Sequence, residues 1–171
     1  MMNQLQSAAR WCVALGVLVL AAACQAPPTA PSAFAAGLSA QQKQVLREQG
    51  FEPTDDGWEL QMSGKLLFDV NSEVLDAPRR ANLALIGGAL HAAGIDQLRV
   101  EGHTDDQGRE TYNEQLSLRR ARVVAQVLAE AGIPADHMVV QGFGFSRPVV
   151  RNASESARKE NRRVAIVIPV H

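Results

Sequence analysis

From residue 62 onward, short apolar runs alternate with segments of helical periodicity, and this alternation limits the fold more than any other feature of the chain. Strands are predicted at 65–68, 98–103, 139–142 and 163–168, and helices at 78–93 and 112–131. Strands that alternate with helices imply a partly parallel sheet with helices packed on it. We therefore predict an α/β (α+β) domain over residues 62–171, in which the order βαβαββ forms a mixed sheet of about four strands on two main helices.

An extension at residues 39–61 is predicted to precede this domain as a short helix and a hairpin. Ser39 is a favourable N-cap for the helix, and Gly50 ends it. Turn residues 53–57 separate two short strands, the second of which is expected to run on towards Phe68. The candidates for contact with a partner protein are Leu46, Phe51, Trp58 and Met62. The alternative is that these side chains form a small satellite core under the helix.

The N-terminal 23 residues have the pattern of a signal peptide. Thirteen apolar residues at 11–23 are fewer than the roughly 20 needed to span a bilayer. Small residues at 21–23 precede Cys24, and the sequence LAAAC resembles a bacterial lipobox. We expect lipidation of Cys24, a Pro/Ala-rich tether at 24–38, and outer-membrane sorting from Gln25. The alternative is an ordinary cleavage site beside an incidental cysteine.

One arginine interrupts the apolar face of the helix predicted at 112–131. The face comprises Leu116, Val123, Val124, Val127 and Ala131. Arg120 lies in its middle, with Asn113 on the same side. Because burying an unpaired charge costs several kcal/mol, Arg120 needs an anion, and Asp105 is the nearest candidate in sequence. The pair either satisfies itself as a structural ion pair or also holds a ligand.

Composition and motifs argue against several other classes of protein. The formal net charge of -1 gives no indication of a nucleic-acid partner. Both cysteines, Cys12 and Cys24, precede the predicted domain, so no disulfide is expected within it. His103 has no further ligand at metal-binding spacing, and no serine or cysteine lies in a nucleophile motif. We expect no metal, no cofactor and no enzymatic activity.

A series of short motifs between residues 62 and 170 is more specific than any of these patterns. They are Phe68-Asp69, Gly102-His103-Thr104-Asp105, Gly108, Asn113, Leu116-Ser117, Arg119-Arg120-Ala121, Gly142-Phe143-Gly144, Pro148 and Asn161-Arg162-Arg163. Together they resemble the C-terminal domain of the OmpA family, which includes the peptidoglycan-associated lipoproteins. The resemblance implies the OmpA-C-like fold and non-covalent binding to the diaminopimelate of peptidoglycan stem peptides.

The same resemblance assigns roles to individual residues. It implies that Asp105 pairs with the ammonium of the ligand and Arg120 with its carboxylate. Asn113 is expected to hydrogen-bond either the ligand or the adjacent loop. The further candidates for the peptidoglycan site are Asp69, Asn71, Thr104, Asp106, Gly108, Leu116 and Arg163.

Residues 38–67, together with NRRVAIVIP near the C-terminus, resemble one branch of this family. In that branch an outer-membrane lipoprotein binds a small periplasmic repressor, which relieves an inner-membrane diguanylate cyclase and promotes surface attachment through cyclic-di-GMP. The tether and first helix would act as the switch. The alternatives are a purely structural anchor between outer membrane and peptidoglycan and, third, a cell-wall hydrolase. A homodimer is left open.

Overall fold

The computed structural model describes residues 37–68, 73–151 and 154–170. Within these residues a five-stranded sheet has the order β1-β2-β5-β3-β4. Its strands are β1 (Glu52–Thr54), β2 (Gly57–Ser63), β3 (Leu98–His103), β4 (Met138–Gly142) and β5 (Arg163–Pro169). β3 and β4 are parallel, whereas β5 is antiparallel to both β2 and β3. The predicted mixed sheet is therefore confirmed, with the hairpin strands forming part of it.

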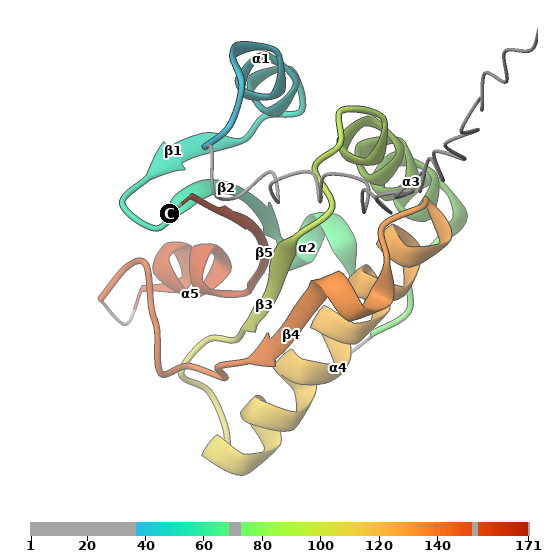
Figure 1. The fold of residues 1–171 in the computed structure, drawn as a ribbon. Coiled ribbons are helices and arrows are strands. Elements are labelled where there is room, and N and C mark those ends of the chain that lie inside the picture. The colour runs from blue at the N-terminus through green and yellow to red at the C-terminus, as the bar shows by residue number, and fades with distance from the viewer. Residues whose placement is uncertain (1–36, 69–72, 152–153, 171) are drawn as a thin grey trace, which may run out of the picture. The chain divides into compact units, whose positions relative to one another are not determined.

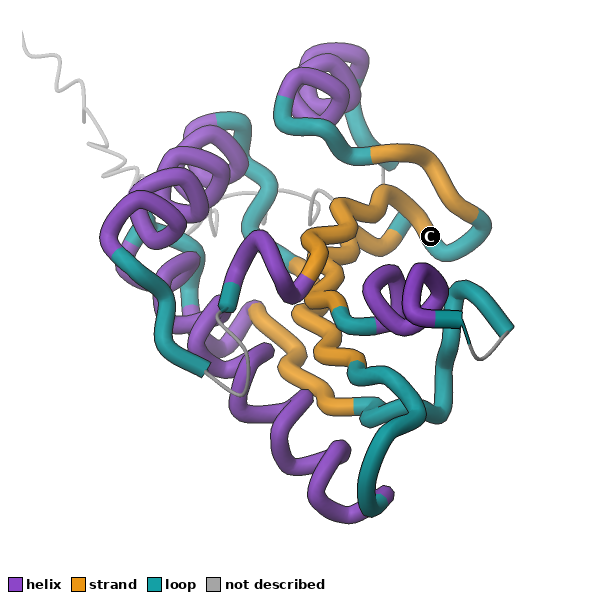
Figure 2. The backbone as a smooth tube through the Cα atoms, turned by 180° about the vertical axis from the view of Figure 1, so that it is seen from behind, coloured by secondary structure: helices purple, strands orange, loops and turns teal. Residues whose placement is uncertain are grey.

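Helices cover both faces of this sheet. They are α1 (Ala40–Glu48), α2 (Gly64–Leu67), α3 (Ala77–Ala92), α4 (Glu110–Glu130) and α5 (Glu155–Asn161), with a 3-10 turn η1 (Ala135–His137) before β4. Figures 1 and 2 show α3 and α4 on one side of the sheet and α5 on the other. The two main helices agree with the prediction, and α5 was not predicted. No helix in the described part of the chain is long and apolar enough to cross a membrane.

The core lies between β5, β3 and the helices α3 and α4. Leu83, Ile86 and Leu90 point into it from α3, as their spacing predicted. Six of the seven residues of the central strand β5 are buried, because helices cover both of its faces. Fully burying one aliphatic side chain stabilises a fold by about 1.5–3 kcal/mol, so this core holds the sheet and both helices together.

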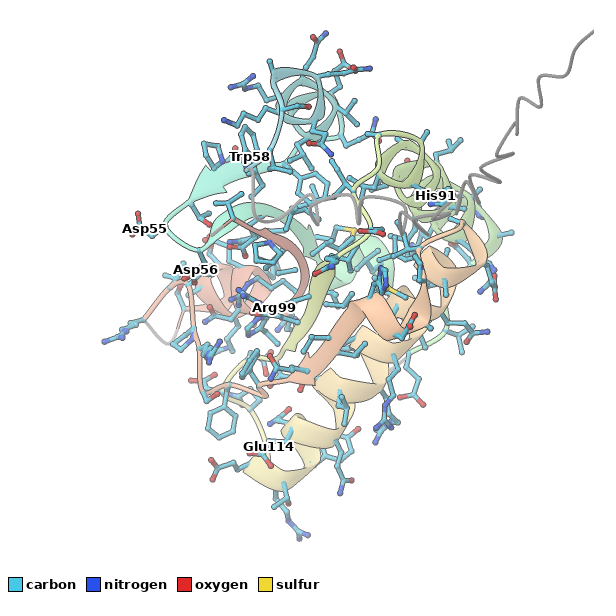
Figure 3. All side chains as sticks on the ribbon, in the orientation of Figure 1. Asp55, Asp56, Trp58, His91, Arg99 and Glu114 are labelled. Atoms are coloured by element: carbon cyan, nitrogen blue, oxygen red, sulfur yellow. The ribbon has the colours of Figure 1, made fainter. Side chains whose placement is uncertain are left out.

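The N-terminal extension shares this core. Ser39 and Gln42 form a capping box that starts α1. Leu46 and Phe51 are 0% and 2% exposed, and both belong to the same hydrophobic cluster as the α3 and β5 residues. Trp58 lies beneath α1 (Figure 3), where the Arg47 guanidinium stands 5.2 Å from the ring centroid. The extension therefore packs on the main core rather than forming a satellite core.

The predicted strand at 65–68 is wrong, because residues 64–67 form the helical turn α2. Ser63 pairs with Arg163, the first residue of β5, so residues beyond Ser63 have no β5 partner. The Gly64 N–H instead donates to the Arg162 carbonyl at 2.6 Å, and Phe68 N–H closes the turn onto the Gly64 carbonyl at 2.7 Å. The sheet strand that precedes α3 is consequently β2, which starts within the predicted extension.

Two glycines allow α4 to lie directly on the sheet. Gly102 of β3 and Gly142 of β4 are paired in the parallel register. A β-carbon on Gly142 would lie 2.5 Å from the Leu118 backbone nitrogen, which is too close for any side chain. The N-terminal half of α4 is thus brought against the carboxyl ends of β3 and β4, where the candidate site residues lie.

Candidate ligand-binding site

A pocket of about 660 Å³ opens between the β3–α4 loop, α4, α2 and α5. Five of the predicted site residues line it, within the part of the chain that is described: Thr104, Asp105, Asn113, Leu116 and Arg120. Three come from α4, and two follow the end of β3. The close packing of α4 on β3 is therefore what brings this part of the predicted site together.

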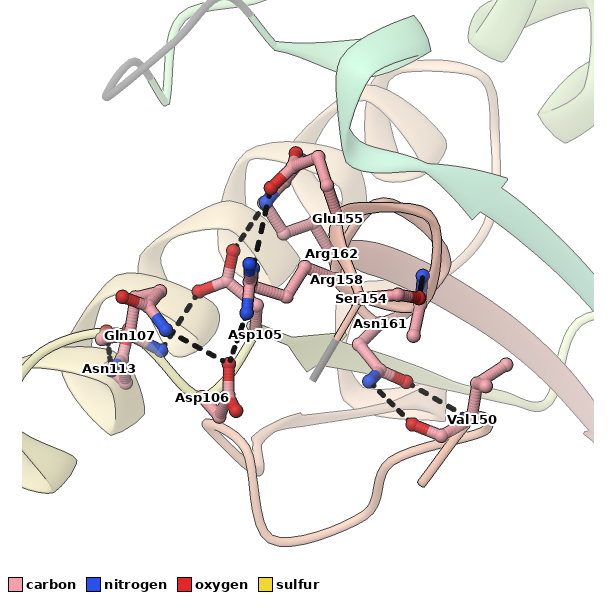
Figure 4. Close-up of polar contacts among 11 residues, drawn as sticks. Asp105, Asp106, Gln107, Asn113, Val150, Ser154, Glu155, Arg158, Asn161 and Arg162 are labelled. Carbon is pink, nitrogen blue, oxygen red and sulfur yellow. Dashed lines mark hydrogen bonds and ion pairs between the residues drawn. The ribbon is translucent and has the colours of Figure 1, made fainter. Parts of the chain in front are cut away.

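Asp105 is the buried acidic residue among those that line the pocket, and it is only 9% exposed. One carboxylate oxygen accepts a hydrogen bond from the Gln107 backbone N–H at 3.2 Å. The other forms an ion pair with Arg162, which also pairs with Glu155 at 3.0 Å (Figure 4). The sequence suggested Arg120 as the partner of Asp105, but the ion pair in the structure is with a residue 57 positions away.

Arg120 lines the same pocket and is 7% exposed. Its guanidinium carbon stands 5.3 Å from the centroid of the Phe68 ring, a cation–π arrangement. Burial lowers the pKa of Arg120, and nearby Tyr112 and Glu73 act against this effect. A guanidinium stays charged at neutral pH even so. The pocket therefore holds a buried cation and a buried anion.

The loop after β3 is held by side chains of the site. The Asn113 amide donates to the Gln107 carbonyl at 2.7 Å, so in this structure Asn113 binds the loop. Gly108 has φ +92°, a left-handed conformation that favours glycine in this tight loop. Thr104 is 4% exposed, and its hydroxyl oxygen has no hydrogen-bond partner among the described residues. This loop presents Asp105 to the pocket.

Among the described residues, Asp106, Gly108 and Arg163 were also predicted for the site but do not line this pocket. Asp106 lies 4.0 Å from Arg158 and borders a neighbouring cavity of about 260 Å³. Arg163 is buried elsewhere, with one nitrogen donating to the Arg147 carbonyl at 3.3 Å. Successive residues of an extended chain point to opposite sides, which is why Arg162 reaches the pocket and Arg163 does not. Asp69, Asn71 and Cys24, for which roles were also predicted, lie outside the described residues.

Several pocket residues were not predicted as site residues. They are Gly64, Phe68, Arg79, Gln107, Tyr112, Glu155, Lys159 and Arg162. Arg162 belongs to the Asn161-Arg162-Arg163 motif, so the motif contained a signal, but its orientation depends on the unpredicted helix α5. The described residues contain no cluster of three or more His, Cys, Asp or Glu side chains placed to hold a metal ion.

Residues 67–162 match the OmpA family, so the chain belongs to that family. The Pseudomonas aeruginosa outer-membrane lipoprotein YfiB is 50% identical over 158 residues, which cover 92% of this chain and 91% of YfiB. The peptidoglycan-binding protein ArfA of Mycobacterium tuberculosis is 36% identical over 83 residues, or 48% of this chain and 26% of ArfA. These matches confirm the resemblance read from the motifs.

A solved structure has the same fold. The peptidoglycan-associated lipoprotein of Burkholderia pseudomallei superposes with a TM-score of 0.53 at 27% identity, covering 59% of this chain and 86% of that chain. The common part is an OmpA-like domain.

Proposed function

We propose that the protein is an outer-membrane lipoprotein, anchored through acyl chains on Cys24, that binds peptidoglycan non-covalently through the meso-diaminopimelate of the stem peptide. Its relatives support the class of ligand, because ArfA is named a peptidoglycan-binding protein and the Burkholderia protein a peptidoglycan-associated lipoprotein. The Pseudomonas aeruginosa relative YfiB, which matches 92% of the chain, is named an outer-membrane lipoprotein.

The observation that carries the proposal is the presence of buried Asp105 and buried Arg120 in one pocket. The free end of a diaminopimelate side chain is a zwitterion, with an ammonium and a carboxylate on one carbon. Arg120 offers a planar fork that matches a carboxylate, and Asp105 offers an oxygen to an ammonium. Because both groups are already desolvated, their pairing with the ligand is strong relative to that of surface charges.

Calorimetry with a diaminopimelate-containing muropeptide tests this function. We expect Arg120→Ala to weaken binding at least about tenfold, since losing one partner of a buried charge pair costs roughly 2–5 kcal/mol and 1.4 kcal/mol corresponds to tenfold. Arg122→Ala is the matched control, because Arg122 lies on the same helix but is exposed. Equal affinity of the wild type and a folded Arg120→Ala protein would refute the role of Arg120.

A regulatory role is the more specific part of the proposal. We infer that the protein sequesters a YfiR-like periplasmic repressor and so activates a YfiN-like diguanylate cyclase, which the 50% identity to YfiB over 92% of the chain supports. The test is a pull-down of the repressor with the full chain and with a chain lacking only residues 25–36. This deletion spares α1, whose Leu46 belongs to the core.

The pull-down gives a different result for each of the proposed roles. Loss or gain of repressor binding on deletion supports a switch in the tether. Unchanged binding refutes the switch but keeps the repressor as partner. No binding by either protein favours the alternative, a purely structural anchor between the outer membrane and peptidoglycan. Release of soluble muropeptides from purified peptidoglycan would instead revive a hydrolase.

A further inference from the structure

Arg162 occupies the part of the pocket next to Asp105. Its guanidinium spans two carboxylates, with one nitrogen on Asp105 and another 3.0 Å from Glu155. The other Asp105 oxygen already accepts from Gln107 N–H. Figure 4 shows Arg162 between these two acids. An incoming ammonium therefore competes with Arg162 for the Asp105 carboxylate.

The excess of basic side chains in the pocket disfavours an ammonium that arrives without a carboxylate. Among the described residues that line it, Arg79, Arg120, Lys159 and Arg162 are basic, whereas only Asp105 and Glu155 are acidic. An ammonium that arrives alone adds a further cation beside Arg162. An ammonium that carries a carboxylate on the same carbon brings its own anion, with which the displaced Arg162 guanidinium can pair.

We propose that Arg162 is a specificity-determining residue that admits an ammonium to Asp105 only when a carboxylate accompanies it. The site then accepts the zwitterionic end of diaminopimelate and rejects the lysine side chain, which has the same ammonium without the carboxylate. This inference rests on the proposed peptidoglycan-binding function and adds to it the basis of ligand selection. Arg120 binds the carboxylate of the ligand, and Arg162 weakens the binding of an ammonium that has no carboxylate beside it.

A purely structural role for Arg162 is the competing explanation. Arg162 and Arg158 both contact Glu155, and Arg158 also lies 4.0 Å from Asp106, so the two arginines attach α5 to the β3–α4 loop. A structural role predicts lower stability and weaker binding of every ligand. A role in specificity predicts a changed ratio between two ligands, which a general loss of stability does not produce.

The experiment measures binding of two muropeptides that differ only in diaminopimelate or lysine at one position. We expect the wild type to prefer the diaminopimelate peptide at least tenfold. In Arg162→Gln the lysine peptide should bind several-fold more tightly than to the wild type, which reduces the preference at least fivefold. Arg158→Gln is the matched control and should keep the wild-type preference, because Arg158 does not line the pocket.

An unchanged preference in a folded Arg162→Gln protein overturns the inference and leaves the proposed function intact. Failure of the wild type to bind either peptide refutes the proposed function itself. Should Arg162→Gln not fold, the wild-type protein still provides a test by ¹⁵N NMR. The Arg162 Nε–H signal should shift on addition of the diaminopimelate peptide, and its failure to move at saturation contradicts the exchange of partners.

Discussion

Gly102 faces the Ser117 carbonyl so closely that a β-carbon on Gly102 would lie 2.0 Å from that oxygen. Real β-carbons do not approach backbone oxygens to this distance, so any side chain on Gly102 pushes α4 away from β3. Asp105 follows β3, and Arg120 lies on α4. The contact between Gly102 and Ser117 thus sets the separation between the two elements that carry the site.

Gly102→Ala should lower the free energy of unfolding by about 3 kcal/mol or more, at or above the usual range for overpacking, because the obstruction is backbone. Gly88→Ala is the matched control, since a β-carbon there meets nothing within 4 Å and Gly88 lies within α3. Alanine at that position should stabilise by about 0.5–1 kcal/mol. Urea unfolding of both variants provides the measurement, and equal stabilities would contradict the packing argument.

Asn161 holds the segment before α5. Its side-chain oxygen accepts from the N–H groups of Val149 and Val150 at 2.9 and 3.2 Å, and its amide donates to the Val150 carbonyl at 2.9 Å. Asn161→Ala removes these three bonds and should cost about 1–3 kcal/mol in thermal or chemical unfolding. Exposed Glu160→Ala should stay within about 0.5 kcal/mol of the wild type. A neutral Asn161→Ala result would argue that water replaces these bonds without loss.

His103 should make the fold sensitive to acid. It is 2% exposed and stacks on Phe143. Neither ring nitrogen has a hydrogen-bond partner among the described residues. Burial, together with the positive charges of Arg163 and Arg147, lowers the pKa of His103 from 6.5 to about 3. The folded protein thus keeps the ring neutral in a range where the unfolded chain protonates it.

Between pH 6.5 and about 3 the unfolded state binds the extra proton, so the contribution of His103 to stability is present above pH 6.5 and falls as the pH falls. The loss reaches roughly 3–5 kcal/mol over that window, at 1.36 kcal/mol per unit of pKa. His103→Phe keeps the aromatic ring and should flatten this part of the pH dependence in urea titrations. A His103 ring signal that titrates near pH 6.5 in NMR would contradict the lowered pKa.

Leu46 tests whether α1 belongs to the folded domain. Its side chain is 0% exposed in the common core, so Leu46→Ala should cost about 2–5 kcal/mol, as in other cores. Exposed Lys43→Ala on the same helix should be nearly neutral. A cost below about 1 kcal/mol for Leu46→Ala would show that α1 contributes little to the stability of the fold.

Local pattern was sufficient for much of the fold and for part of the site. The helical spacing of Leu83, Ile86 and Leu90 predicted their burial in α3, and the alternation of Val164, Ile166 and Ile168 predicted a strand at 163–168, where β5 lies. The spacing of Arg120 from Leu116 and Val124 placed the arginine on the buried face of α4. These features depend on the helical period of 3.6 residues and the strand period of 2, which the sequence contains directly.

Other features depend on contacts between segments far apart in the chain. A strand was predicted at 65–68, but residues 64–67 form a helical turn, because β5 begins at Arg163 and offers no pairing partner beyond Ser63. The extension joined the main core because β2 pairs with β5 along its length. Neither the helical turn at 64–67 nor the packing of the extension could be predicted from local sequence patterns, because both depend on how β2 pairs with the distant strand β5.

The sequence by itself determined that a buried arginine and an acid at the end of a strand belong to a domain of this family. Only the tertiary structure decided which ion pair forms there. Asp105 pairs with Arg162 rather than Arg120, because α5 and the start of β5 bring Arg162 over the β3–α4 loop. Charges select partners by distance in space, and the 57 residues between Asp105 and Arg162 become a contact only when the sheet forms.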